Sequence, residues 1–239
     1  MRSMKSIKKA IMIRLNRVRR IKQYSSRYVV LRILELSRFN VCSFLSFVLF
    51  KVKCRIHAIE CGKKIVVYGN VVIRGPGKII IGNNVAMNSS PWRCASSSVA
   101  NSVRFRTHTY SPRGDNKIII GNNVGLQGTS ITARSTTVRI GDHTLIGPDC
   151  MITDADFHSI WPPSERTKPG VESDAPVNIG EHVFIGSRCI ILKGVTIGDN
   201  SVIISGSVVL NDIPKNALVG GNPAKVLRLF PDVQDIFLE

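Results

Sequence analysis

The chain has 239 residues, 44% of them hydrophobic, and a net charge of +17 at pH 7. This length and composition suit one domain with a full core and an appendage. Residues 1–55 hold 15 Lys and Arg against the single acid Glu35, a net charge of +14. Residues 56–239 hold 18 basic and 15 acidic residues, a net charge of +3. The larger part is nearly neutral, which excludes a charge-based argument for nucleic acid binding there.

The basic N-terminal segment predicts a cationic amphipathic helix, because Ile7, Ile11, Val18 and Ile21 recur at mostly helical spacings among lysines and arginines. The apolar stretch 41–50 is too short for a membrane span, and no small-residue cleavage site follows it. Two interpretations stay open: contact with an anionic membrane, or a cap on the open end of the repeat domain. We expect a cytoplasmic protein that binds no nucleic acid, peripheral at the inner face of the plasma membrane under the first interpretation.

The region from Ile179 to Val209 repeats every six residues. An aliphatic residue returns at each sixth position, and the residue four further on is small or β-branched, at 183, 189, 195, 201 and 207. Six residues make one short strand and one tight bend. Three units therefore close a coil of 18 residues, the spacing from Ile179 to Ile197, with the leading aliphatic side chains inside.

This repeat resembles the hexapeptide-repeat family of left-handed parallel β-helix proteins, most of which are acyltransferases that use acyl-CoA or acyl carrier protein. Looser units at 140–151, 120–131 and 81–86 extend the resemblance over most of the chain beyond about residue 65. Left-handed crossovers are rare in other parallel sheets, so the expected handedness comes from the resemblance. The predicted organisation is all-β: a basic, helical segment 1–55, a left-handed β-helix domain 56–230 and a short tail 231–239.

Two insertions interrupt the repeats, near 88–116 and 153–177, and such loops carry function more often than the coils do. The second begins with Asp154, Asp156 and His158 within five residues. Imidazole suits removal of a hydroxyl proton at neutral pH, so His158 is the candidate general base, and either carboxylate could orient its ring. The loop resembles the acidic-histidine loop of sugar O-acetyltransferases, which implies direct acetyl transfer with no acyl-enzyme.

Two residues are candidates for acceptor binding. Gln127 stands where related sugar acetyltransferases carry an amide residue that faces the histidine, which implies a contact with the acceptor or the oxyanion, and a plain turn role is the alternative. Trp161 could stack on a sugar, or it could anchor the loop by packing beside Pro162 and Pro163. His108, in the first insertion, could line an acceptor site, but an ordinary loop role is the preferred interpretation.

The segment 212–226 resembles the family's terminal motif, a valine and glycine before Pro-Ala-Lys-Val, which packs beside CoA. Lys225 and Arg228 match its basic positions and suit phosphates as charge-assisted donors, whereas Asn222 replaces a more usual small apolar residue. No metal is expected, because zinc needs converging histidines and no clustered pair accompanies His158. The resemblance implies acetyl-CoA contacts at Phe184, Ser187, Ser205, Gly206, Gly221, Pro223, Lys225 and Arg228. For Phe184, Ser187 and Ser205 a plain structural role in the coil is the alternative, since they also fit the repeat.

The sequence therefore predicts an acetyl-CoA-dependent O-acetyltransferase that acts on a saccharide in bacterial surface-polysaccharide assembly (O-antigen, capsule or exopolysaccharide). An amino-sugar N-acetyltransferase is the alternative, since one histidine base serves either nucleophile. A non-enzymatic membrane- or anion-binding scaffold is a third reading, favoured by the basic segment alone. The resemblance also implies a homotrimer with sites between subunits, in which Lys225 of one chain serves His158 of another.

Overall fold

The computed structural model describes residues 42–90, 101–108, 116–168 and 173–232. Contacts within the chain divide it into two compact units, Met1–Ser43 and Phe44–Glu239, and the fold described here is that of the second. The helix predicted around residues 7–21 lies outside the described residues.

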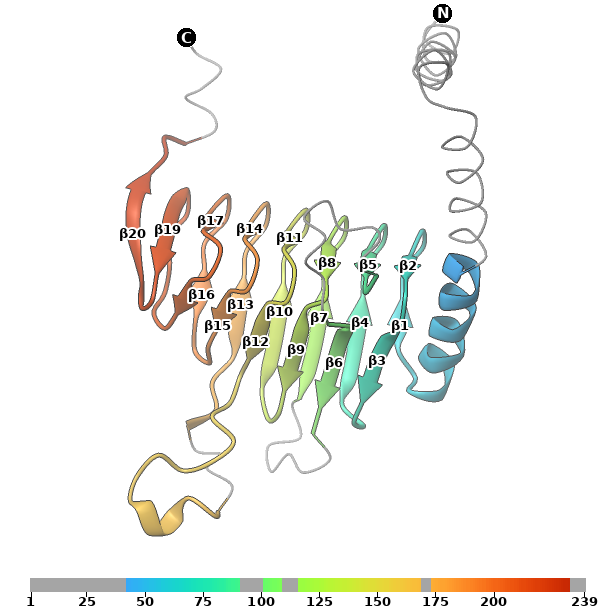
Figure 1. Ribbon diagram of the computed structural model, residues 1–239, viewed down its shortest axis with the longest axis horizontal. Helices are drawn as coiled ribbons and strands as arrows, with labels where there is room; N and C mark the ends of the chain where they lie inside the picture. Colours follow the sequence, from blue (N-terminus) through green and yellow to red (C-terminus); the bar gives the residue numbers. More distant parts are fainter. Residues whose placement is uncertain (1–41, 91–100, 109–115, 169–172, 233–239) are drawn as a thin grey trace, which may run out of the picture. The chain divides into compact units, whose positions relative to one another are not determined.

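The described residues of the second unit wind through three β-sheets, A, B and C, in that order and repeatedly (Figure 1). All strand pairs are parallel except the last hairpin, β19 with β20. Sheet A holds β1 (Glu60–Cys61), β4 (Lys78–Ile81), β7 (Lys117–Ile120), β10 (Thr137–Ile140), β13 (Val177–Ile179) and β16 (Thr196–Ile197). Sheet B holds β2 (Val66–Tyr68), β5 (Ala86–Asn88), β8 (Gly125–Gln127), β11 (Leu145–Ile146), β14 (Phe184–Ile185), β17 (Val202–Ile203), β19 (Ala217–Gly221) and β20 (Ala224–Leu229). Sheet C holds β3 (Val71–Arg74), β6 (Val103–Thr107), β9 (Ser130–Ala133), β12 (Met151–Thr153), β15 (Ile190–Ile191) and β18 (Val208–Val209).

The six-residue repeat fills the centre of this coil. The leading aliphatic residues Ile179, Ile185, Ile191, Ile197, Ile203 and Val209 are each at most 1% exposed. Strand register places one coil above the next, so that Ile140, Ile179 and Ile197 stand in line. Each such side chain contributes about 1.5–3 kcal/mol by leaving water. The parallel β-helix predicted from the sequence is confirmed.

The bends form three corners, named by the sheets that they join. The A/B corner comprises bends such as 121–124, 141–144 and 180–183, and its turning residue has positive φ in successive coils. Asparagine tolerates this left-handed conformation better than most residues, and it bonds from coil to coil, as from Asn84 Nδ2 to Asn123 Oδ1 at 2.8 Å. His143 and His182 occupy the same corner position, where both are exposed and their rings stack with centroids 4.6 Å apart.

Strand β6 lies inside the stretch 88–116 that the sequence suggested was a single insertion. Val103 and Phe105 are fully buried and alternate with exposed arginines at 104 and 106. This alternation has a period of two and lacks the glycine and aliphatic lead of the hexapeptide, so the repeat pattern did not reveal it. The stretch is therefore not a single insertion, because it contains a strand of sheet C.

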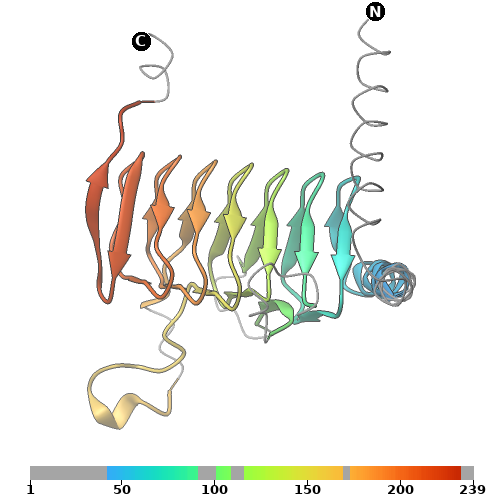
Figure 2. The same ribbon diagram turned by 45° about the horizontal axis from the view of Figure 1, so that its top comes forward.

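Residues 42–56 are helical, and one side of this helix covers the first coil (Figure 2). Phe50 and Cys54 are buried in the same core cluster as Ile65 and Val67, and the Lys53 ammonium donates to the carbonyl oxygen of Val71 at 2.7 Å. This part of the chain is a cap. The other side of the helix remains apolar and 40–72% exposed, at Phe44, Leu45, Val48, Leu49, Val52 and Ile56. Among the described residues, no helix is both long enough and apolar enough to cross a bilayer.

The cap makes a testable contribution to stability. Replacing Phe50, which is 1% exposed, with Ala should lower the free energy of unfolding by about 3–5 kcal/mol, because a cavity opens between the helix and the first coil. The matched control Leu49→Ala changes a side chain that is 60% exposed and should change stability by no more than about 0.5 kcal/mol. Urea unfolding of both variants at one protein concentration measures the difference. Equal losses would contradict a capping role for Phe50.

Candidate functional site

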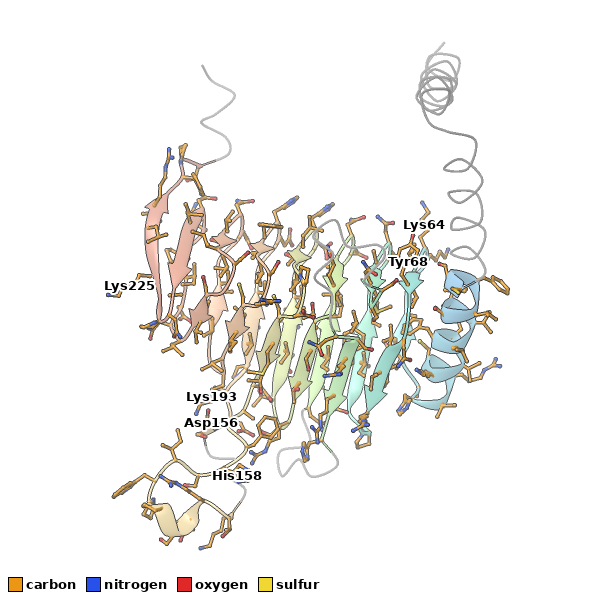
Figure 3. The ribbon with its side chains drawn as sticks, viewed as in Figure 1. Lys64, Tyr68, Asp156, His158, Lys193 and Lys225 are labelled. Atoms are coloured by element: carbon orange, nitrogen blue, oxygen red, sulfur yellow. The ribbon has the colours of Figure 1, made fainter. Side chains whose placement is uncertain are left out.

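The second insertion leaves the coil after β12 and returns at β13, at the C/A corner, whose other bends include 75–77, 134–136 and 192–195. Its two limbs meet at the base, where the Ala175 N–H donates to the Asp154 carbonyl oxygen at 3.0 Å. Beyond that base the loop projects from the stack and contains the 3-10 helix η2 (Pro163–Glu165) and His158 (Figure 3). The loop therefore presents its histidine without distorting the coils above and below it.

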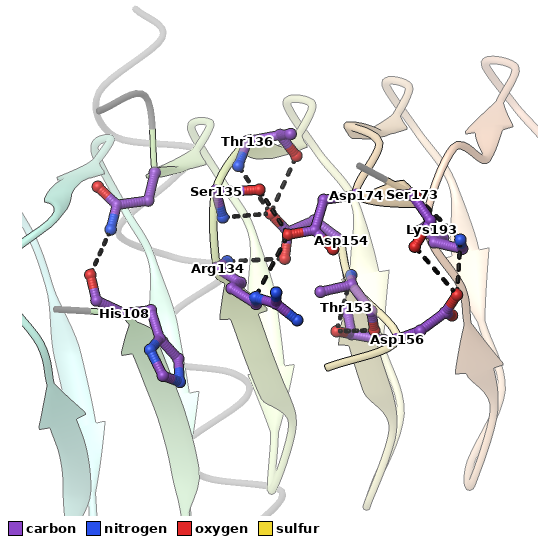
Figure 4. Close-up of polar contacts among 12 residues, drawn as sticks. His108, Arg134, Ser135, Thr136, Thr153, Asp154, Asp156, Ser173, Asp174 and Lys193 are labelled. Carbon is purple, nitrogen blue, oxygen red and sulfur yellow. Dashed lines mark hydrogen bonds and ion pairs between the residues drawn. The ribbon is translucent and has the colours of Figure 1, made fainter. Parts of the chain in front are cut away.

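Asp154 anchors the loop base and makes no hydrogen bond to His158. Its carboxylate is fully buried and accepts the backbone N–H groups of Arg134, Ser135 and Thr136 at 2.7–3.1 Å (Figure 4). The Thr136 hydroxyl adds a fourth bond at 2.9 Å. A carboxylate that holds three amides of the preceding coil stabilises that turn and has little freedom to orient an imidazole.

Asp174, on the returning limb, holds the same turn from its other side. Its Oδ2 accepts the Ser135 hydroxyl at 2.5 Å and lies 3.4 Å from Arg134 Nε. Burial raises the pKa of Asp174, while the Ser135 hydrogen bond and the Arg134 charge oppose that rise. The Arg134 side chain is 4% exposed, and its guanidinium lies 5.7 Å from the ring centroid of Phe157. This contact fixes the residue that immediately precedes His158.

Asp156 is paired with Lys193 of the next coil, at 2.6 Å between Oδ2 and Nζ. The same ammonium donates to the Ser173 carbonyl oxygen at 2.9 Å (Figure 4). Lys193 therefore binds the outgoing and the returning limb of the loop at once. Both acids that the sequence offered as partners for His158 serve, in this structure, to position the loop.

The His158 ring is oriented by a backbone group. Its Nδ1 lies 2.8 Å from the carbonyl oxygen of Arg166, the residue that ends η2. A carbonyl oxygen only accepts, so Nδ1 carries the proton and Nε2 is the basic nitrogen of the neutral ring. Phe157 before it has φ of 69°, a left-handed conformation that is unusual for an aromatic residue and that the Arg134 contact supports.

An open pocket of about 770 Å³ surrounds this histidine. Met151, Thr153, Asp156, Arg166 and Leu192 are among the residues that line it. Trp161 is 77% exposed, so it does not anchor the loop by packing against the described residues, and its indole face is available to a ligand.

Gln127 lies at a different corner from His158. It ends β8, at the B/C corner, whose bends include 147–150, 186–189 and 204–207, and its carbonyl oxygen accepts the Asp149 N–H at 3.2 Å. Sheet C separates this corner from the C/A corner where His158 lies. One chain therefore does not bring the two residues together.

The eight predicted CoA contacts lie in strands and the hairpin of sheet B near the end of the chain and at the B/C corner. Phe184 is 48% exposed on β14, and Ser187 and Ser205 stack in successive coils, joined by a 3.0 Å bond from the Ser187 N–H to the Ser205 hydroxyl oxygen. Gly206 and Gly221 have φ of 76° and 106°, where glycine avoids strain. Pro223, Lys225 and Arg228 are exposed in the hairpin of β19 and β20, which extends the same sheet.

The histidine and the CoA surface lie at opposite edges of sheet C. The chain crosses that sheet from Ser187 at the B/C corner to Lys193 at the C/A corner, six residues on, which is about 20 Å of extended chain. Figure 3 shows Lys225 and His158 well separated. Acyl transfer requires reacting atoms about 3–3.5 Å apart, so one chain does not assemble both halves of such a site.

Several residues of the site escaped the sequence analysis: Arg134, Asp174, Lys193 and the carbonyl group of Arg166. Arg134 and Lys193 both follow strands of sheet C at the C/A corner, three and two residues after Ile131 and Ile191, which stand in line in the sheet. The Arg166 carbonyl has no sequence signature, because any residue carries that group. Within the described ranges no group of three or more His, Cys, Asp and Glu is arranged to hold a metal ion.

Comparisons with known proteins agree with this architecture. The family model described as "Hexapeptide repeat of succinyl-transferase" matches residues 176–211. The galactoside O-acetyltransferase of Escherichia coli (strain K12) is 44% identical over 96 residues, 40% of this chain and 46% of that protein. That of Lactococcus lactis is 39% identical over 97 residues, 41% of this chain and 45% of that protein. The chain thus spans less than half the length of these curated relatives.

Among solved structures, AntD, an N-acyltransferase from Bacillus cereus in complex with dTDP and 3-hydroxybutyryl-CoA, shares the fold with a TM-score of 0.56 at 18% identity. The alignment covers 80% of this chain and 94% of that one. The chain is a left-handed parallel β-helix protein of hexapeptide repeats. Its resemblance to the hexapeptide-repeat acyltransferases, and to sugar O-acetyltransferases among them, is confirmed.

Substitutions of the two acids near His158 should have clearly different effects on stability. Asp154→Asn leaves at least one of three buried N–H groups without an acceptor, at about 1–3 kcal/mol for each, so the free energy of unfolding should fall markedly. Asp156→Asn weakens a partly exposed ion pair and should cost at most about 1 kcal/mol. Urea unfolding of the two variants checks this order. A larger loss for Asp156→Asn would refute the assignment of Asp154 as the anchor.

Proposed function

We propose that this protein is an acetyl-CoA-dependent acetyltransferase that acetylates a sugar hydroxyl, with His158 as general base, in bacterial surface-polysaccharide assembly. The observation that carries the proposal is the His158 ring in an open pocket, with Nδ1 bound to the Arg166 carbonyl oxygen at 2.8 Å and Nε2 left basic. The galactoside O-acetyltransferases that the chain resembles support an acetyl donor and a sugar acceptor.

In the proposed reaction the acceptor hydroxyl oxygen attacks the thioester carbonyl carbon while its proton passes to His158 Nε2. The tetrahedral intermediate collapses by breaking the C–S bond, and the imidazolium returns the proton to the leaving CoA thiolate. The Arg166 carbonyl oxygen stabilises the imidazolium through Nδ1, the task that a carboxylate performs in a Ser-His-Asp triad. Lys193, Asp154 and Asp174 hold the loop, so that little orientation is lost between binding and reaction.

We further propose that the active unit is a homotrimer. The predicted CoA contacts and Gln127 share the B/C side of one chain, while His158 and Trp161 project from the C/A corner in a loop that reaches beyond the stack (Figure 1). A neighbouring copy related by a threefold axis can place its projecting loop against that B/C side. Lys225 and Arg228 would then meet the phosphates of a CoA whose thioester lies beside the partner's base.

The proposal includes peripheral contact with an anionic membrane. The exposed apolar side of helix 42–56 follows the most basic part of the sequence, a combination typical of helices that lie in the interface of anionic lipid. Capping and membrane contact use opposite sides of the same helix, so the two interpretations of the N-terminal segment are compatible.

Replacing His158 with Ala should reduce acetyl transfer by about 10²–10⁴-fold, because a general base is lost, while acetyl-CoA binding is kept. The assay is release of CoA thiol over a panel of sugars and amino sugars, which also separates O- from N-acetylation. The control His143→Ala alters an exposed corner imidazole and should leave turnover unchanged. Near-normal transfer by His158→Ala would disprove the mechanism.

Mixed trimers test whether sites are shared between chains. His158→Ala and Lys225→Glu subunits should each be inactive alone, and mixing after dissociation should restore part of the activity, because some interfaces then combine two intact halves. Light scattering reports the assembly in each sample. A fully active monomer, or mixtures that never exceed the parents, would contradict the shared site.

Membrane contact is measured by sedimentation with anionic liposomes. Changing both Leu45 and Leu49, which are 54% and 60% exposed, to Glu should abolish cosedimentation without unfolding the chain, since the buried side of the helix is untouched. Raised salt should weaken binding of the wild type through screening. Cosedimentation that survives both changes would exclude this surface as the membrane contact.

A further inference from the structure

Three arginines stand together on the outer face of sheet C. Arg104 and Arg106 are exposed on β6, where they alternate with buried residues that point into the coil. Arg74 is exposed at the end of β3, and strand register places it directly beside Arg106. The three side chains therefore share one surface of the prism, the sheet on which the His158 pocket also lies.

This arrangement costs stability. Neighbouring strands are about 4.8 Å apart, and like charges directly opposite each other in a sheet repel. In the part of the chain that the structure describes, no carboxylate forms an ion pair with Arg74, Arg104 or Arg106. A repulsive cluster without an internal counterion is the expected form of a site that receives its negative charge from a ligand.

The cluster lies at a definite distance from the His158 pocket. Thr153, which lines the pocket, pairs with Thr132, and Thr132 pairs with Arg106 on the next strand. Two strand spacings make about 10 Å. A sugar ring joined through its anomeric oxygen to a diphosphate spans a comparable length, so a hydroxyl on the ring can reach the pocket while the diphosphate lies over β6.

The neighbouring titratable group responds to this positive field. His108 follows β6, and its pKa is lowered first by burial and then by the charges of Arg106 and Arg134. The nearby acids Asp154 and Asp174 act in the opposite direction but more weakly. At His108 the two arginine charges therefore outweigh those of the nearby acids.

We infer that the acceptor is a sugar diphosphate whose phosphates bind Arg104 and Arg106, with Arg74 contributing through its charge. This inference rests on the proposed transfer at His158 and names the chemical class of its acceptor. Guanidinium groups match phosphate oxygens as charge-assisted, two-pronged donors. The diphosphate can come from a nucleotide-linked or a polyprenyl-linked sugar, which share this group.

Isothermal titration calorimetry with two probes tests the site in the full-length protein. UDP represents the nucleotide carrier, and farnesyl diphosphate in a neutral detergent represents the prenyl carrier. At least one should bind, and the double variant Arg104→Gln/Arg106→Gln should weaken that binding about tenfold or more. The matched control is Arg139→Gln, an exposed arginine on β10 in sheet A, which should bind like the wild type.

Each outcome of the titrations supports or overturns the inference. Binding of one probe alone supports the site and identifies the carrier, and binding of both supports the shared diphosphate. Failure of both probes, or an equal affinity in the wild type and the double variant, overturns the inference. Thermal unfolding and light scattering accompany each titration, because the double variant should be at least as stable as the wild type once the repulsion with Arg74 is removed. A drop in trimer content would instead assign these arginines to a subunit contact and overturn the inference.

The inference and the proposed function can fail separately. If His158-dependent acetylation of a free sugar is observed while neither diphosphate binds, the base and the reaction stand and the diphosphate site falls. If UDP binds through Arg104 and Arg106 but His158→Ala keeps full transfer activity, the site stands and the mechanism falls.

Discussion

Every feature of this molecule depends on one constraint: each coil must lie directly on the one below it. The contact between coils is so close that a Cβ on Gly141 would lie 2.5 Å from the carbonyl carbon of Gly180. Inside the coil, a column of aliphatic side chains fills the interior. An insertion can therefore leave only at a corner, and functional groups are confined to the corners and the outer faces of the sheets.

This constraint explains what the sequence could predict. The inward position returns every sixth residue and admits only a narrow range of side chains, so the stretch from Ile179 to Val209 revealed the coil and its core. Strand β6 has the same geometry with a different composition. Its buried and exposed residues alternate, and this short pattern was not recognised among the polar residues of the expected loop. The hexapeptide signal is strong where the repeats are regular and weak where a strand lacks the glycine and the aliphatic lead of the repeat.

The sequence predicted where the site lies better than it predicted which groups form hydrogen bonds there. A histidine after two acids marks the loop, but nearness in sequence does not decide which groups meet in space. Asp154 turns back toward the coil because three amides of the 134–136 bend offer a buried carboxylate more than one imidazole can. The His158 ring instead forms its hydrogen bond with a carbonyl oxygen of its own loop. That choice depends on how the loop closes, which no single residue type encodes.

The closed base of this loop allows the loop and the coils to change independently in evolution. The Ala175 to Asp154 hydrogen bond brings the two limbs together into a closed ring, and the contacts of Asp156, Ser173 and Asp174 with the coils all lie near this base. Lengthening such a ring lowers the free energy of unfolding only slightly, since doubling the length of a flexible loop costs about 0.6 kcal/mol. The loop can thus be remodelled, or exchanged between related proteins, while the coils that carry the opposite edge of sheet C remain as they are. In the proposed acetyltransferase, the His158 pocket could then change while the predicted CoA surface is kept.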